Sequence, residues 1–172
     1  ESLILDLQGN GGGYLNRAVE LSDEFLSEGK KIVFTRGRTS PPEDYNSSVI
    51  GGWEKGKLAI LVDESSASAS EIVSGAVQDW DRGLIIGRRS FGKGLVQKPF
   101  QLPDGSAIRL TVAHYYTPSG RNIQKPYKLG EEDEYELDFS NRVKSGELFS
   151  ADSVKFEDST NYYTNSKRLV KG

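Results

Sequence analysis

The apolar positions in the first part of the chain alternate between short strand-like runs and segments with helical spacing. Leu3 to Leu7 is an apolar run that leads into the glycine-rich segment Gln8 to Gly13. From Leu15 to Leu26 the apolar residues recur at the spacing of an amphipathic helix. Lys31 to Thr35 is the next apolar run, so the order predicts a strand, a glycine loop, a helix and a strand, which is a βαβ unit.

The same order of elements repeats further along the chain. Lys57 to Val62 predicts a third strand, Ala69 to Trp80 a second helix and Leu84 to Gly87 a fourth strand. Strands that alternate with helices in this way are typical of an α/β fold. We therefore expect a mainly parallel sheet that helices cover on both faces.

A C-terminal β-hairpin is predicted after these units. Leu95 to Leu102 and Ala107 to Tyr116 read as antiparallel strands, and the turn residues Pro103-Asp-Gly105 separate them. Residues 37–56 are rich in Gly, Pro, Ser and Asn and predict a long surface excursion.

The last part of the chain differs in composition from the rest. Residues 128–172 are polar and contain the acidic run Glu131 to Glu134. We expect a single core domain over residues 1–127 and a polar, acidic tail over residues 128–172 that is a lid, a linker or disordered.

Composition and charge exclude several classes of function. The chain has 22 Lys or Arg and 25 Asp or Glu without a clustered basic stripe, which argues against a nucleic acid as partner. No run approaches the ~20 apolar residues of a transmembrane helix. No signal sequence precedes the first strand, and the absence of methionine indicates a fragment or a processed product.

The absence of cysteine excludes thiol chemistry, and His114 is the only histidine. It lies in the middle of a predicted strand, which favours a packed or surface role over a catalytic one. One histidine without cysteine also disfavours a zinc site, and we expect neither a metal nor another cofactor.

Ser68 is the candidate nucleophile. It lies where the third predicted strand leads into the second helix, so its side chain would project at the carboxyl edge of the sheet beside free helix N–H groups. Such N–H groups could hold an oxyanion. The alternative is structural, because Ser68-Ala-Ser-Glu71 has the pattern of a capping box, and the local sequence alone favours the cap.

Lys93 is the candidate base, and it stands between Gly92 and Gly94. Gln97 follows at an even spacing that places both side chains on one face of a strand, where the amide could orient the amine. A lysine accepts a proton only in its neutral form, which burial without a counter-charge favours. A solvated lysine in a turn is the alternative.

Lys93 also fits a second pattern. Gly87 to Lys93 has the spacing of a phosphate-binding loop and follows a predicted strand, which would indicate a nucleotide-binding domain. However, Gly94 stands where a Ser or Thr hydroxyl is required, and Leu95 to Leu102 does not read as a helix. This alternative is therefore disfavoured.

The loop Gly9-Asn-Gly-Gly-Gly13 presents successive backbone N–H groups that no side chain crowds. These groups suit an oxyanion or a phosphate. The loop does not match a dinucleotide fingerprint, because Tyr14 stands where the third glycine is required. A turn whose glycines serve only the backbone geometry is the alternative.

Several ordered sequence blocks in residues 1–127 resemble the C-terminal processing peptidases, the tail-specific proteases of peptidase family S41. The blocks are Leu5-Asp-Leu-Gln-Gly-Asn-Gly-Gly12, Ser66-Ala-Ser-Ala-Ser-Glu-Ile72, Gln78-Asp79, Ser90-Phe-Gly-Lys-Gly94 with Val96-Gln97, Leu102-Pro-Asp-Gly-Ser106 and Tyr116-Thr-Pro-Ser-Gly-Arg-Asn-Ile-Gln124. The resemblance implies a crotonase-like (ClpP-like) core and a serine endopeptidase with a Ser-Lys dyad that cleaves proteins near their C-terminal ends.

The resemblance also implies the role of each site residue. Ser68 would be the nucleophile, Lys93 the general base and Gln97 its orienting partner. The Ala69 N–H and one N–H from Gly11, Gly12 or Gly13 would form the oxyanion hole.

Two positions depart from the family pattern, since Gln8 stands in place of an arginine and Ser65 in place of a glycine. The family's upstream PDZ domain and its final strands are not in this sequence. The resemblance implies a protein or peptide substrate and export to a periplasm, lumen or cell exterior. A non-catalytic peptide-binding module of the same fold is the alternative function, and the sequence does not indicate an oligomeric state.

Overall fold

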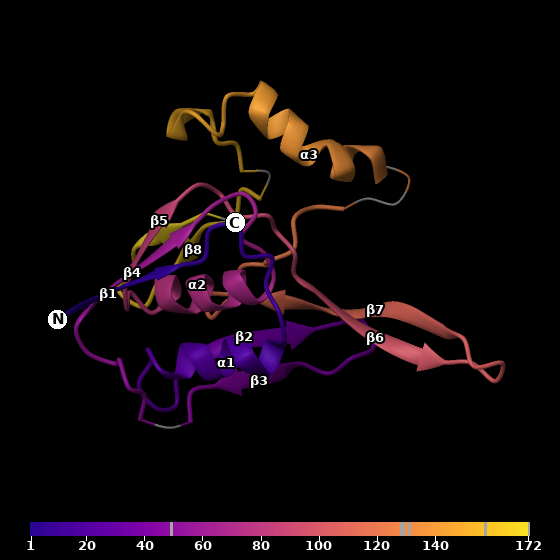
Figure 1. Ribbon diagram of the computed structural model, residues 1–172, viewed down its shortest axis with the longest axis horizontal. Helices are drawn as coiled ribbons and strands as arrows, with labels where there is room; N and C mark the ends of the chain where they lie inside the picture. Colours follow the sequence, from indigo (N-terminus) through magenta and orange to yellow (C-terminus); the bar gives the residue numbers. More distant parts are fainter. Residues whose placement is uncertain (49, 128–129, 131, 157, 172) are drawn as a thin grey trace.

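A parallel sheet and an antiparallel sheet enclose a central helix (Figure 1). This arrangement comes from a computed structural model that describes residues 1–48, 50–127, 130, 132–156 and 158–171. The elements are β1 (Ser2–Asp6), α1 (Leu15–Asp23), β2 (Lys31–Arg36), β3 (Glu43–Asn46), β4 (Lys57–Val62), α2 (Ala69–Asp79), β5 (Leu84–Gly87), β6 (Leu95–Gln101), β7 (Ala107–Tyr116), α3 (Glu132–Lys144), the 3-10 helix η1 (Ala151–Ser153), β8 (Tyr162–Tyr163) and β9 (Leu169–Val170).

The parallel sheet has the strand order β1-β4-β5. Leu5 lies opposite Ile60, and Ile60 lies opposite Ile85. The central strand buries Leu58, Ile60 and Val62 on the face that meets the helices, because alternate side chains of a strand point to one face. The predicted α/β architecture with parallel strands is confirmed.

The antiparallel sheet has the strand order β3-β2-β7-β6 and contains the two segments of the predicted hairpin. The expected βαβ unit over the first two strands is wrong, because β2 pairs with β7 and not with β1. Phe34 of β2 lies opposite Tyr116 of β7, and their stacked ring centroids are 5.1 Å apart. β3 forms within the expected surface excursion and pairs with the other edge of β2.

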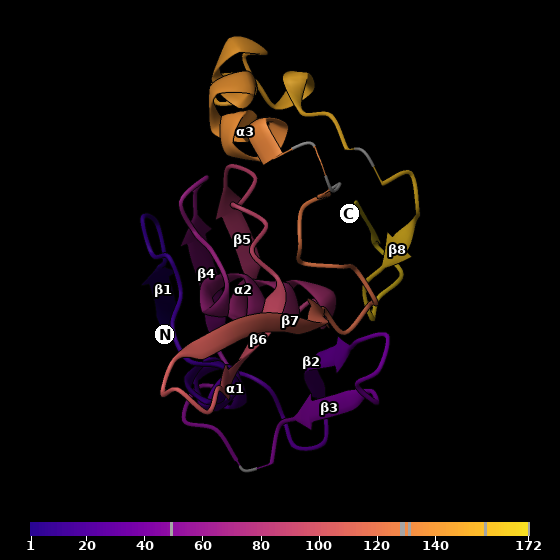
Figure 2. The same ribbon diagram turned by 90° about the vertical axis from the view of Figure 1, so that its right-hand side faces the viewer.

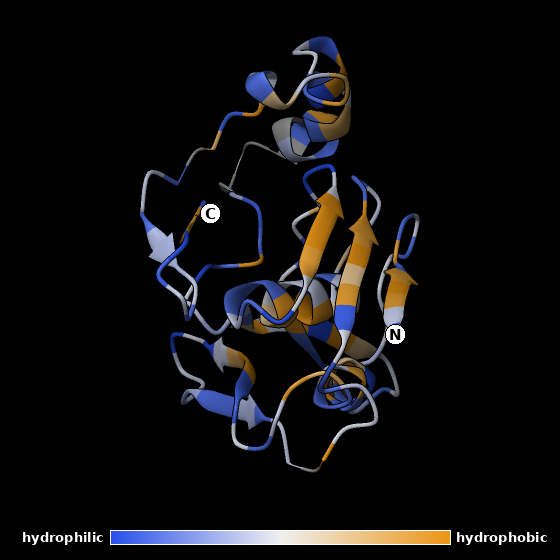
Figure 3. Ribbon diagram, turned by 90° about the vertical axis from the view of Figure 1, so that its left-hand side faces the viewer, coloured by the Kyte–Doolittle hydropathy of each residue, from blue (hydrophilic) through white to orange (hydrophobic). Residues whose placement is uncertain are grey.

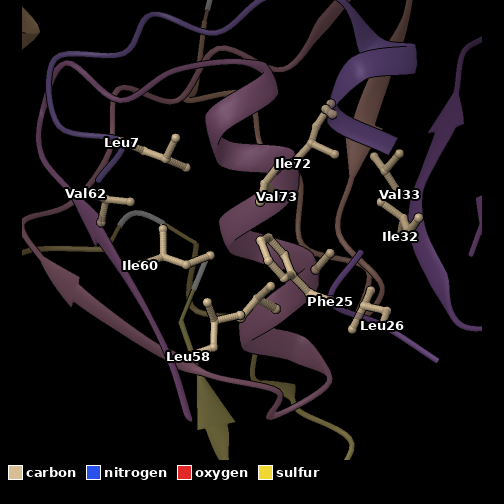
Figure 4. Packing of buried hydrophobic residues seen from close by; sticks show 13 residues of the cluster. Leu7, Phe25, Leu26, Ile32, Val33, Leu58, Ile60, Val62, Ile72 and Val73 are labelled. Atoms are coloured by element: carbon tan, nitrogen blue, oxygen red, sulfur yellow. The ribbon is translucent and has the colours of Figure 1, made fainter. Parts of the chain in front are cut away.

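The helix α2 contacts strands of both sheets and is buried along most of its length. Ile72, Val73, Ala76 and Val77 are each 2% exposed or less. They pack against side chains from β2, β4 and the segment after α1 (Figure 4). Full burial of a side chain such as Ile or Val contributes about 1.5–3 kcal/mol, so this packing fixes the helix whose first turn follows Ser68.

The outer face of the parallel sheet is open to solvent. Helices on both faces were expected, but α1 and α2 contact each other on the same side (Figure 1). On the other side Ile4 is 67% exposed and Leu84 is 62% exposed, and Figure 3 shows that the strands of this sheet consist largely of apolar residues. The expectation that both faces are covered is therefore wrong for the described residues.

The segment after residue 127 contains helical and strand structure. The helix α3 lies beyond the end of β5 (Figure 2), and β8 pairs with β9. None of the described helices has the length and apolar character needed to cross a membrane.

Candidate active site

Ser68 occupies a strained turn between β4 and α2. It is the N-cap residue of α2 and has φ 55° and ψ −112°, a backbone conformation that side-chain-bearing residues rarely adopt. Such a conformation costs on the order of 1–3 kcal/mol and persists only where the surrounding structure holds it. A sharp strand-to-helix turn of this kind pushes the serine side chain outward, as in the nucleophile elbow of the α/β-hydrolases.

The capping interpretation of Ser68 holds only in part. The Ser68 N–H donates to Glu71 Oε2 at 2.8 Å, which is the Glu half of a capping box. The Ser68 side chain and the Glu71 N–H have the arrangement of the other half, but this half is weak, because the Glu71 N–H donates to the Ser68 carbonyl oxygen at 3.0 Å. The hydroxyl is therefore a weak cap that forms no side-chain cap hydrogen bond.

The glycine loop packs directly against this turn. A β-carbon on Gly12 would lie 2.7 Å from Ser68 Cβ and 2.8 Å from the Ala69 nitrogen, so only glycine allows this approach. Gly12 also has φ 97°. Its N–H donates to Asn10 Oδ1 at 2.9 Å and is occupied.

Three of the proposed oxyanion donors are free. Among the described residues, no hydrogen bond engages the N–H groups of Ala69, Gly11 and Gly13. Asn10 fixes the loop beside them, because its carbonyl oxygen accepts from the Ala67 N–H at 3.0 Å. The loop and the first turn of α2 therefore present unpaired N–H groups to the same region.

Lys93 does not adopt the expected position. We expected a shielded amine in contact with Ser68 and Gln97, but the side chain is exposed, and Nζ forms no hydrogen bond or ion pair within the described part of the chain. The Gln97 amide instead lies 3.4 Å from the Thr111 hydroxyl. The expected shielding is wrong, because the lysine lies in an irregular loop and not on β6.

The backbone around Lys93 is nevertheless well defined. The Lys93 N–H donates to Glu71 Oε2 at 2.8 Å, the same oxygen that accepts from Ser68. Gly92 has φ 85°, and a β-carbon there would lie 2.8 Å from Lys125 Cβ. A strand follows Lys93 where a phosphate-binding loop requires a helix, which disfavours nucleotide binding further.

The sequence identified Glu71 only as part of a cap, but the structure gives it a larger part in the site. Its carboxylate accepts from the N–H groups of Ser68, Gly92 and Lys93 and from the Ser90 hydroxyl, at 2.6 to 2.8 Å. Burial raises the pKa of Glu71, and these hydrogen bonds oppose the shift. One buried carboxyl group thus joins the Ser68 turn to the Lys93 loop.

A recess of about 160 Å³ opens beside the free N–H groups. Its walls include the apolar side chains of Leu7, Leu21 and Val73, while Tyr14 and Arg17 also line it. His114 lies elsewhere, with Nδ1 3.3 Å from the Asn122 amide and beside Arg36 and Arg38. Groups of His, Cys, Asp and Glu that could hold a metal ion do not occur among the described residues.

Known proteins match most of this region. The family model of Peptidase family S41 matches residues 1–133. A carboxy-terminal-processing protease of Bartonella bacilliformis is 48% identical over 122 residues, which cover 70% of this chain and 28% of that protein. The chloroplastic carboxyl-terminal-processing peptidase 3 of Arabidopsis thaliana is 39% identical over 128 residues, which cover 73% and 24%.

The fold comparison gives the same family. The solved structure of a photosystem II D1 C-terminal processing protease superposes with a TM-score of 0.67 at 37% identity, over 72% of this chain and 32% of that one. This chain spans less than a third of the length of these relatives.

Proposed function

The chain belongs to peptidase family S41, and from this premise we propose that the complete protein is a serine endopeptidase that cleaves proteins near their C-terminal ends. Residues 1–127 are part of a crotonase-like catalytic core, and residues 128–172 form a segment attached to it. The substrate is a protein or peptide, and the place of action is a periplasm, a lumen or the cell exterior.

The observation that carries this proposal is the strained backbone of Ser68. The turn costs stability, and its hydroxyl is only a weak cap without a side-chain cap hydrogen bond. The free N–H groups of Ala69 and the glycine loop lie beside it, as an oxyanion hole requires. A nucleophile accounts for both features.

The reaction follows the order of a serine-lysine dyad. Neutral Lys93 takes the proton from Ser68 Oγ, and Oγ attacks the substrate carbonyl carbon. The Ala69 N–H and the N–H of Gly11 or Gly13 hold the oxyanion. Protonated Lys93 gives its proton to the departing amine, and water then hydrolyses the acyl-enzyme in the reverse sequence.

Two side chains must move before this reaction. The exposed Lys93 amine has to turn toward Ser68, and their backbones are already neighbours because both donate to Glu71 Oε2. Gln97 then exchanges its weak contact with Thr111 for one with the amine, which it orients. The apolar recess takes a substrate side chain next to the scissile bond.

The test is Ser68→Ala in the complete protein, with a peptide that carries a C-terminal extension as substrate. Turnover should disappear, while the free energy of unfolding should fall by no more than about 1 kcal/mol, because the hydroxyl is only a weak cap. A serine-directed fluorophosphonate should label Ser68 of the parent. Turnover by the variant at the parent's rate would refute the mechanism.

A non-catalytic peptide-binding module is the second candidate. The exposed Lys93 without a side-chain partner favours it. In that case the parent would bind the peptide and show no turnover that depends on Ser68.

A further inference from the structure

The loop that precedes Lys93 packs against the C-terminal part of α3 and against the segment that follows this helix. Arg142 of α3 is only 3% exposed. Its Nη1 donates to the Ser90 carbonyl oxygen at 3.1 Å, and its Nη2 donates to the Arg89 carbonyl oxygen. One buried guanidinium thus binds two successive carbonyl groups of the loop.

Glu147 fixes this guanidinium from the other side. Its Oε1 accepts from Arg142 Nε at 2.8 Å. The same carboxylate binds Arg89 of the loop through both oxygens, at 2.8 and 3.0 Å. A buried arginine is stabilising only where its donors are satisfied, and here a carboxylate and two carbonyl oxygens satisfy them.

Lys125 forms a second link between the loop and α3. Its N–H donates to the Gly92 carbonyl oxygen at 3.0 Å. Its Nζ lies 4.6 Å from the Phe91 ring centroid and 4.0 Å from that of Tyr135, and it binds Asp138 Oδ2 at 3.2 Å. The loop is therefore held by Glu71 on one side and by the segment Tyr135 to Glu147 on the other.

We propose that the segment Tyr135 to Glu147 is a strap that holds the Lys93 loop, and that Arg142 is a positioning residue for the general base. This proposal rests on the role of Lys93 in the proposed function. Arg142 and Glu147 lie beyond residue 133, where the family match ends, so the strap is an addition to the matched region. Its effect would pass through Ser90 and Gly92, which also bind Glu71.

The test compares Arg142→Gln with the parent in the complete protein. Glutamine cannot reach both carbonyl groups and the carboxylate, so the amides of Gly92 and Lys93 should exchange hydrogen about tenfold faster or more. The kcat for the peptide should fall by about tenfold or more with KM little changed, because the base is displaced and substrate contacts are not. Arg142→Lys should restore part of kcat.

The matched control is Arg168→Gln, which removes a half-exposed arginine that pairs with Asp81 in the same C-terminal part of the chain. It should leave amide exchange in the loop and kcat unchanged. A purely structural role of Arg142 would lower the melting temperature of Arg142→Gln and leave kcat unchanged below the melting range, which would overturn the proposal.

Should Arg142→Gln not fold, Glu147→Gln loosens the same contacts with Arg142 in place and should give smaller changes in the same direction. Loop exchange equal to that of the parent in this variant would overturn the strap. A parent without Ser68-dependent turnover would refute the proposed function instead, while amide exchange would still decide whether the strap holds the loop.

Discussion

Gly12→Ala tests whether the glycine loop serves the reaction or only the turn. The added β-carbon would lie 2.5 Å from the Ala67 carbonyl oxygen, 2.7 Å from Ser68 Cβ and 2.8 Å from the Ala69 nitrogen. All three distances are too short for a carbon atom, and no side-chain rotation can relieve them. The loop must therefore move away from the turn that carries Ser68.

The cost has two parts. Overpacking costs about 1–3 kcal/mol, and alanine at the φ of 97° costs roughly 1–2 kcal/mol more. We therefore expect a loss of about 2–5 kcal/mol in the free energy of unfolding. Displacement of one oxyanion donor would lower kcat by about 10²–10³-fold.

Gly9→Ala is the matched control. Gly9 has φ 67°, and a β-carbon there would have nothing within 4 Å, so this variant carries the backbone cost without the clash. Urea unfolding and peptide turnover should show a modest loss of stability with turnover retained. The reasoning would be refuted if Gly12→Ala lost no more stability than Gly9→Ala and kept its turnover.

Three further results are expected. Lys93→Arg should be inactive in the peptide assay because guanidinium stays charged, and hydrolysis by this variant would mean that another group is the base. Glu71→Gln should lower kcat by about tenfold or more, since its amide NH₂ would face donors that now bind a carboxylate, and an unchanged kcat would remove Glu71 from the positioning of the site. Burial favours the neutral form of Glu147, but Arg89 and Arg142 hold its pKa below the usual value. The ionised Glu147 therefore stabilises the fold above the usual pKa of Glu, and this contribution is lost as the pH falls through the lowered pKa of the folded state. The free energy of unfolding, followed by circular dichroism, should therefore fall less steeply with decreasing pH in Glu147→Gln.

The apolar pattern predicted the strands of the parallel sheet because each strand corresponds to a short run of adjacent apolar residues. The partner of β2 was not predictable in this way, since the contact between Phe34 and Tyr116 joins distant segments. The need for glycine at position 92 also comes from a distant segment, because Lys125 leaves no room there for a side chain.

The candidate site was predicted in its residues more than in its geometry. The motif identified Ser68, but no local pattern encodes its positive φ or the close approach of Gly12 to it. Glu71 appeared only as a cap, because its contacts with the Lys93 loop arise when β5 and α2 lie together. The exposed lysine shows that a motif fixes the residue type and leaves the side-chain rotamer open.

The backbone conformation of Ser68 places stability and activity in opposition. Glycine adopts a positive φ without the penalty that serine carries, so Ser68→Gly should relieve strain at this turn, partly offset by the greater freedom of glycine in the unfolded chain. The variant would hold its shape and have no hydroxyl. Selection for thermal stability alone would therefore favour the loss of the proposed nucleophile. A programme that stabilises this protein must keep Ser68 in spite of its strained backbone.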